Sequence, residues 1–103
     1  MLATLTKTKS FGNFWDVLLR FNNPGPTLIT LKNEGPDPIH VQINRTIDGV
    51  MTPISLVGNS PVLMILPGDK FVRPLYDSPY MTIVKCRASA ARATVIGTIV
   101  SQE

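Results

Sequence analysis

The clearest strand in the sequence is Pro38-Ile39-His40-Val41-Gln42-Ile43-Asn44-Arg45. Its apolar residues at 39, 41 and 43 alternate with polar ones, which is the two-residue period of a strand with one dry face and one wet face. Upstream, residues 27–33 are rich in β-branched and apolar side chains, and residues 34–37 supply the turn Glu-Gly-Pro-Asp. We therefore expect 27–33 and 38–45 to pair as an antiparallel hairpin.

A second strong turn is Leu66-Pro67-Gly68-Asp69. Proline presets φ at the first central position of a type II turn, and glycine accepts the positive φ that the second position needs. The turn separates two further expected strands, residues 62–66 and 70–76. Because Pro74 has no N–H for a ladder, we expect the second of these strands to lie at an edge or to end there.

Three other segments are less regular. Residues 14–21 alternate as a strand would, although Asn13 and Asp16 would also suit the cap of a short helix, and we favour the strand. Residues 50–57 are apolar but interrupted by Pro53, which indicates a poor strand at an edge. Residues 1–13 form either a first strand, an arm that adds to a neighbour's sheet, or a tail, and strand or arm is favoured because threonine is abundant.

The last expected hairpin joins residues 80–87 and 92–100 through a short connector, so that Arg87 pairs with Arg92. Side chains that are small and apolar then share one face, which we assign to the core. The opposite face is apolar at one end and basic at the other, and such a face needs a cover, either another layer of this domain or a neighbouring subunit. The core face carries Tyr80, Thr82, Val84 and Cys86 against Ile99, Gly97, Val95 and Ala93, and the opposite face carries Met81, Ile83, Lys85 and Arg87 against Thr98, Ile96, Thr94 and Arg92.

These segments predict an all-β fold, a single-domain antiparallel β-sandwich or barrel of about eight short strands. With 103 residues the chain has room for one domain, in which residues 1–13 form the strand or arm and residues 14–103 form the sandwich. No segment has the pattern of a signal peptide or of a transmembrane span, so we expect synthesis in the cytoplasm and no membrane partner.

The composition argues against an enzyme. The chain has one histidine and one cysteine, so a Cys/His zinc site or a Ser-His or Cys-His centre with a spare histidine is excluded. His40 lies on the wet face of its strand, and Cys86 lies on the expected core face, where a thiol acts as a small hydrophobe. The seven acids are dispersed, and five sit in or beside turns. We expect no catalytic residue, no cofactor and no metal.

The basic residues of the last hairpin are a candidate contact patch. Between Ser78 and Gln102 there are three basic residues, Lys85, Arg87 and Arg92, and no acidic one, although ordinary solvated charge also explains them. Like charges facing each other favour an acidic partner. No aromatic residue lies near these arginines in the sequence to stack a base, so a protein partner is favoured and nucleic acid is not. Trp15, Tyr76 and Tyr80 would serve a carbohydrate-binding module, but Trp15 has apolar neighbours and is expected in the core.

The order of motifs resembles a family of virion proteins. Asn33-Glu34-Gly35, then the alternating strand 38–44, then Leu66-Pro67-Gly68-Asp69-Lys70 leading into Phe71-Val72, is similar to the small all-β decoration or cement proteins of tailed bacteriophages. The resemblance spans roughly Thr27 to Val84. It implies a structural protein of the virion that self-associates, often as a trimer, and clamps the major capsid protein on the outside of the shell.

The resemblance and the undercharged composition, 17% charged residues against about 25% in typical soluble domains, make a homo-oligomer the expected form. A nucleic-acid or anion-binding β-module and a carbohydrate-binding or adhesion sandwich are the alternatives. For the oligomer or capsid interface the sequence suggests Leu2, Leu5, Met81, Ile83 and Ile96.

Overall fold

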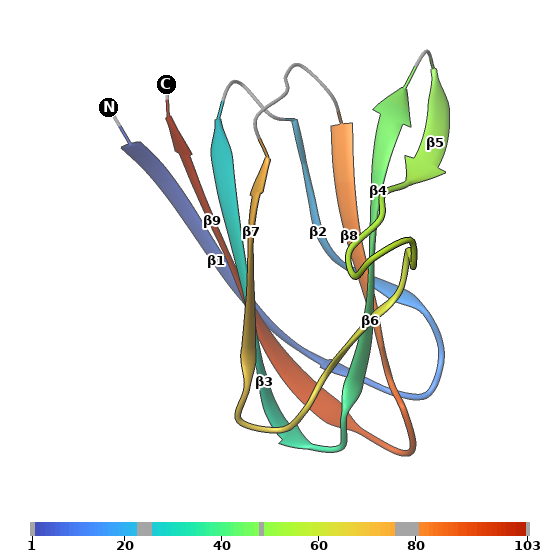
Figure 1. Ribbon diagram of the computed structural model, residues 1–103. Helices are drawn as coiled ribbons and strands as arrows, with labels where there is room; N and C mark the ends of the chain where they lie inside the picture. Colours follow the sequence, from blue (N-terminus) through green and yellow to red (C-terminus); the bar gives the residue numbers. More distant parts are fainter. Residues whose placement is uncertain (1, 23–25, 48, 76–80, 103) are drawn as a thin grey trace.

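The structure is a computed structural model that describes residues 2–22, 26–47, 49–75 and 81–102. These residues form nine β-strands and no helix, in two antiparallel sheets that pack face to face (Figure 1). The described residues therefore contain no helix that is long and apolar enough to cross a membrane. The expected all-β sandwich is confirmed. Sheet A contains, in spatial order, β1 (Leu2–Phe11), β9 (Ala93–Gln102), β3 (Thr27–Pro36) and β7 (Lys70–Leu75), and sheet B contains β2 (Asp16–Asn22), β8 (Met81–Ala88), β4 (Ile39–Ile47) and β5 (Val50–Pro53), with β6 (Leu63–Ile65) paired to the first part of β4.

The connectivity is that of a jelly roll. The chain alternates between the sheets from β1 to β4 and again from β6 to β9, and β5 is an extra strand between the two halves. The antiparallel pairs β4·β6, β3·β7, β2·β8 and β1·β9 are nested, as if one long hairpin had been folded and then rolled up. This nesting of strands into two sheets defines the double-sheet jelly roll, an architecture found in viral capsid proteins, lectins and cupins.

Both expected hairpins, 27–33 with 38–45 and 80–87 with 92–100, are wrong as pairings. Residues 27–33 belong to β3 in sheet A, whereas 38–45 belong to β4 in sheet B, so the turn between them carries the chain across the sandwich. The Pro-Gly turn does the same between β6 and β7, and the 89–92 loop does so between β8 and β9. The reason is that turn residues specify only a reversal of direction. A corner between sheets and a hairpin within one sheet need the same residue types.

The structure agrees with the predictions of individual strands, sheet edges and buried faces. Residues 16–22 are a strand, β7 with Pro74 is an edge of sheet A, and β5 with Pro53 is an edge of sheet B. Residues 2–11 form β1, the other edge of sheet A. Of the core face predicted for the last two strands, Thr82, Val84, Cys86, Ala93, Val95, Gly97 and Ile99 are all buried, and Tyr80 lies outside the described residues.

The core lies between the sheets and is filled mainly by branched aliphatic side chains from alternate positions. Gly97 of β9 packs closely against β2 of the opposite sheet. A Cβ atom at this position would lie 2.9 Å from side-chain carbons of both Leu18 and Leu19 of β2. Cys86 is fully buried in the same core, and burial raises the pKa of its thiol to about 12, so it is a structural residue. The fully buried members of the core include Leu18, Ile29, Leu31, Ile39, Val41, Ile43, Val84 and Val95.

Asn33 joins the turns at one end of the sandwich through hydrogen bonds. Its amide Nδ2 donates to the carbonyls of Asp37 and Ile65, each at 2.9 Å, and its Oδ1 accepts the N–H of Gly35 at 2.7 Å. Its own backbone bonds to Asp69 and Gly68 of the Pro-Gly turn. The N-x-G and Pro-Gly-Asp motifs seen in the sequence are therefore two halves of one hydrogen-bonded corner.

Asp37 ties the remaining loop at this end. Its Oδ2 accepts the backbone N–H groups of Ala91 at 2.8 Å and of Arg92 at 2.7 Å. These two bonds hold the pKa of the Asp37 carboxyl below its ordinary value, because they favour the charged form. The 89–92 loop is thus anchored to the corner that Asn33 organises.

Candidate functional site

The outer face of sheet A is uncharged over most of its area. The strand register places side chains of four strands in rows, for example Thr6, Thr98, Thr30 and Val72. Leu28 and Val72 on this face are 40% and 47% exposed. Charged residues begin at one end of the face, where Lys32 of β3 lies opposite Lys70 of β7 in the strand register. We name this surface the threonine face, and it consists of Thr4, Thr6, Thr8, Ser10, Leu28, Thr30, Val72, Pro74, Thr94, Ile96, Thr98 and Val100.

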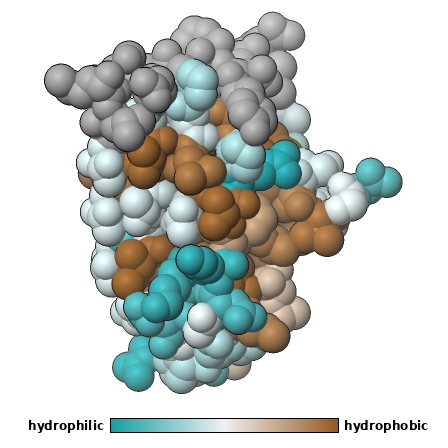
Figure 2. All heavy atoms as spheres, turned by 60° about the vertical axis from the view of Figure 1, so that its left-hand side comes forward, coloured by the Kyte–Doolittle hydropathy of each residue, from teal (hydrophilic) through white to brown (hydrophobic). Residues whose placement is uncertain are grey.

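Figure 2 brings the sheet A side of the molecule forward. Pale and brown side chains occupy its middle part, and teal ones gather in a cluster at the lower end. Within the face, hydroxyls contact each other across the strands, as between Ser10 and Thr94 at 2.9 Å. The face therefore offers methyl groups and paired hydroxyls, whose removal from water costs little compared with that of charges.

The outer face of sheet B is basic. Arg20 of β2 lies beside Ile83 of β8, and next along β8 come Lys85 and Arg87. Among the described residues of β2, β4, β5, β6 and β8, Asp16 is the one acidic residue. Its side chain points elsewhere, so the strands place no carboxylate on this face. Gln42 and His40 of β4 lie opposite Lys85 and Arg87. We name Arg20, His40, Gln42, Lys85 and Arg87, with Trp15, the basic face.

Trp15 is part of this surface. The Arg87 guanidinium lies over its indole ring, 5.2 Å from the centroid, and the tryptophan is 37% exposed. The expectation that Trp15 is a core residue is therefore wrong. Its neighbours in the sequence are apolar, but residues 12–15 form the loop between the sheets, and this loop lays the indole on the outside of sheet B. Tyr76 and Tyr80, the other aromatic residues considered for carbohydrate binding, lie outside the described residues.

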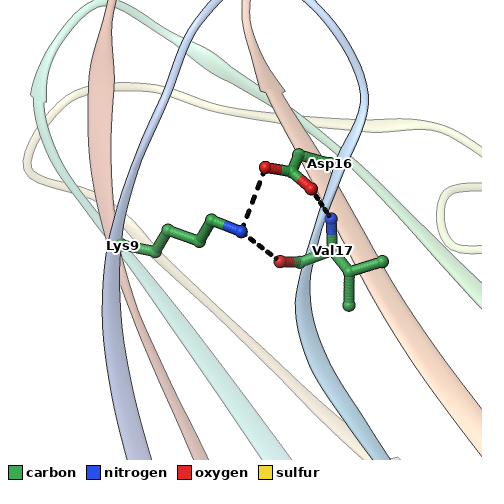
Figure 3. Close-up of polar contacts among 3 residues, drawn as sticks. All are labelled: Lys9, Asp16 and Val17. Atoms are coloured by element: carbon green, nitrogen blue, oxygen red, sulfur yellow. Dashed lines mark hydrogen bonds and ion pairs between the residues drawn. The ribbon is translucent and has the colours of Figure 1, made fainter.

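Asp16 faces away from the basic face. Figure 3 shows its carboxylate turned toward β1, where Oδ2 contacts Lys9 Nζ at 3.0 Å and Oδ1 accepts the Val17 N–H at 2.8 Å. Lys9 also donates to the Val17 carbonyl at 3.0 Å. The hydrogen bond from Lys9 and that from Val17 lower the pKa of Asp16. This clamp joins the edges of the two sheets and leaves the cations of the basic face without an acid beside them in the described part of the chain.

The structure divides the predicted basic patch. Lys85 and Arg87 share the basic face, but Arg92 lies in the loop before β9, where its backbone is bonded to Asp37. Arg20 and Trp15 take its place in the patch, and the sequence argument missed both. They come from β2 and the loop before it, and only the long-range pairing of β2 with β8 brings them to Lys85 and Arg87.

The residues suggested for an interface do not form one surface. Ile96 lies on the threonine face, while Leu5 is on the opposite side of sheet A, at its uncovered margin, and is 53% exposed. Met81 and Ile83 lie on the outer side of sheet B, and Ile83 is only 8% exposed. For Leu2 the structure describes the backbone, which pairs with Gln102.

One groove of about 730 Å³ lies at the margin where β6 and β7 meet. Its walls combine apolar side chains with the charged residues Lys32, Asp69 and Lys70. In the described ranges, no three His, Cys, Asp or Glu side chains gather where they could hold a metal ion. The groove is lined by Lys32, Leu63, Met64, Ile65, Leu66, Gly68, Asp69, Lys70 and Phe71.

Comparison with protein-family models and with curated proteins finds no match to this chain.

Proposed function

We propose that this chain is a structural protein of a bacteriophage virion, which self-associates as a trimer and binds the outside of the capsid. The observation that carries the proposal is the threonine face, an exposed and uncharged sheet surface on a jelly roll. Jelly rolls commonly build viral shells. The motif order shared with decoration proteins points to the same role, with the major capsid protein as the partner and the virion as the location.

The threonine face suits repeated, individually weak contacts. Its twelve positions, each about 4.8 Å by 6.8 Å, cover an area of about 400 Å². Each partner of a standard stable complex buries about 800 Å², so this face alone forms a weak contact. A closed oligomer and a lattice multiply weak contacts, because each further contact of a linked copy is intramolecular. The absence of charge over most of this face keeps the desolvation cost of each contact low.

A trimer also needs a second, different patch. A face that meets its own copy produces a two-fold dimer, whereas a ring pairs one patch with another. The groove between β6 and β7 is a second patch with apolar side chains, of which Met64 and Leu66 are exposed, beside the charged residues Lys32, Asp69 and Lys70. We propose that the threonine face of one subunit meets this groove of the next.

The solution mass tests self-association. By light scattering on a sizing column, we expect the purified chain to have three times its 11.3 kDa mass. Leu28→Lys with Val72→Lys places two charges on the threonine face and is expected to give a monomer. Met64→Lys in the groove is expected to do the same. The control, Met51→Lys with Val57→Lys, changes equally exposed residues outside both patches and should leave the trimer intact.

Two results would contradict this part of the proposal. A wild-type monomer at every concentration would exclude self-association in solution. A dimer that Leu28→Lys with Val72→Lys dissociates, but that Met64→Lys leaves intact, would replace the trimer with a face-to-face pair.

The virion location has its own test. Gradient-purified phage particles from the source cells are digested briefly with protease and analysed by mass spectrometry. Peptides of this chain should be present in many copies and should be lost before those of the internal proteins. Particles that lack the chain, or that protect it from external protease, would contradict binding on the outside of the shell.

A further inference from the structure

The basic face combines cations with an exposed indole, and this combination has a use beyond assembly. We propose that the basic face binds single-stranded nucleic acid, with Lys85, Arg87 and Arg20 contacting phosphates and Trp15 stacking on a base. The inference does not depend on the proposed structural function. It concerns the outer face of sheet B, which lies on the opposite side of the molecule from the threonine face.

The spacing of the cations suits a charged strand. Lys85 and Arg87 are two residues apart on β8 and point to the same side, so their Cα atoms are about 6.7 Å apart. Arg20 extends the row, because it pairs with Ile83, the next residue of β8 on that side. Lys85 and Arg87 therefore form a row on β8, and Arg20 lies one strand away, beside the next outward position. Such a row attracts a polyanion and binds its phosphates by charge-assisted hydrogen bonds.

Arg87 is positioned by an aromatic ring and has no carboxylate partner in the described chain. Its guanidinium lies against Trp15, and its Nε has no hydrogen-bond partner there. Arginine is more often held by an acid when a protein uses it for structure alone. Here the stacking orients the guanidinium and leaves its charge for a ligand.

The exposed indole of Trp15 favours nucleic acid over other acidic partners. An acidic protein surface would need the cations only, whereas a single strand also offers bases that stack on an indole. Phe14, the preceding residue, is exposed as well and is a second aromatic residue in the same loop. Gln42 and His40 lie beside the cations and have the donors and acceptors that read base edges. The sequence argument against nucleic acid was the lack of a nearby aromatic residue, and the fold supplies one.

A single strand fits better than a duplex. The basic face is a sheet surface with no helix or ribbon that could enter a groove. Stacking on Trp15 also requires an unpaired base, which a duplex does not present.

The experiment uses fluorescein-labelled 12-mers of mixed sequence, as DNA and as RNA, with the intact chain. Binding is measured by anisotropy at 50 and 200 mM salt. Because Trp15 is the only tryptophan of the chain, its fluorescence reports stacking directly. We expect saturable binding with quenched tryptophan fluorescence. Three phosphate contacts predict a roughly 20-fold loss of affinity between the two salt concentrations.

Variants separate the two kinds of contact. Lys85→Gln with Arg87→Gln should weaken binding and flatten its salt dependence. Trp15→Leu should cost about tenfold in affinity, measured by anisotropy, with the salt dependence unchanged. Lys70→Gln is the matched control, since it removes an exposed charge from sheet A and should change affinity little. Thermal melting of each variant checks that it folds.

Four outcomes would overturn the inference. These are no binding at 50 mM salt, equal binding of heparin with unchanged tryptophan fluorescence, preference for a duplex over the single strand, and equal loss of binding in the Lys70→Gln control. The second outcome would show a surface for anions in general, such as an acidic protein partner.

Discussion

Asn33 shows how much of this fold depends on a single side chain. Its amide is fully buried and satisfies two carbonyls and one N–H from three separate turns or strands. A buried polar group of this kind is stabilising only while all its partners are present. The corner between β3, β4, β6 and β7 therefore has one polar residue at its centre.

Replacing Asn33 by Ala should cost about 2–4 kcal/mol of unfolding free energy, because two carbonyls and an N–H lose their partners in a buried corner. Urea denaturation measures this loss. The matched control is Asn59→Ala, since Asn59 is exposed in a turn, and it should change stability by less than about 0.5 kcal/mol. Similar losses for the two variants would show that the hydrogen bonds of Asn33 are not needed.

Asp37 should make stability depend on pH at the acid end. Its folded pKa lies below the ordinary value of 3.8, so folding favours the charged carboxylate. The resulting stabilisation is complete above the ordinary pKa and is lost as pH falls through the folded pKa. We expect Asp37→Asn to be less stable than wild type at pH 7, and the difference to shrink when urea melts are repeated near pH 3. A difference that stays constant from pH 7 to pH 3 would contradict this assignment.

At the scale of strands, the sequence predicted faces but not pairings. Alternation in 38–45 and in the last two strands assigned the buried side correctly, because a strand shows its burial pattern whichever strand it pairs with. The same residues cannot specify a partner. Residues 27–33 pair with β7 and β9, both far along the chain, while the turn at 34–37 leads across the sandwich.

The same limit applies to the candidate surfaces, because a sequence shows which residues share a strand but not which strands are neighbours. Lys85 and Arg87 could be grouped from the sequence because they share one strand. Arg20, Trp15 and most of the threonine face could not, since each needs a neighbour from another strand pair. The error about Trp15 has this origin, because local hydropathy does not show that a loop turns outward.

Gly97 controls the distance between β9 and β2. Gly97→Ala would bring a methyl group to 2.9 Å from Leu18 and Leu19 carbons, and we expect a loss of about 1–3 kcal/mol from overpacking. Thr98→Ala is the control in the same strand, since its side chain lies on the outer face, and it should change stability by under about 0.5 kcal/mol. The double variant Gly97→Ala with Leu18→Val should recover part of the loss. If Gly97→Ala is as stable as wild type, the two layers are not in tight contact there.

For the whole molecule, the order of strands in the sheets determines which pieces are dispensable. β8 lies between β2 and β4, and β9 lies between β1 and β3, so the last two strands are central in both sheets. β1 is an edge strand and pairs with β9 alone.

We therefore expect a fragment of residues 1–75 to be unfolded and a fragment of residues 11–103 to fold with reduced stability. The second fragment keeps Phe11, which is buried, and loses the remainder of an edge strand together with the Lys9–Asp16 clamp. Circular dichroism with urea titration distinguishes the two. A cooperative transition in the shorter fragment would show that β1 to β7 are stable without β8 and β9.

The nested pairing also bears on how the protein forms in a cell. A ribosome releases the chain from its N-terminus, so β1, β2, β3 and β4 emerge before the two strands that join them. Until β8 and β9 have left the ribosome, β1 has no ladder partner and β2 is not connected to β4. β3 and β4 can pair earlier with β7, β5 and β6, but β1 and β2 must stay unpaired, or be held by a chaperone, until β9 and β8 have been made. Both sheets are therefore completed only after β8 and β9 have emerged, and a chain that stalls or is truncated before them would be a substrate for proteolysis.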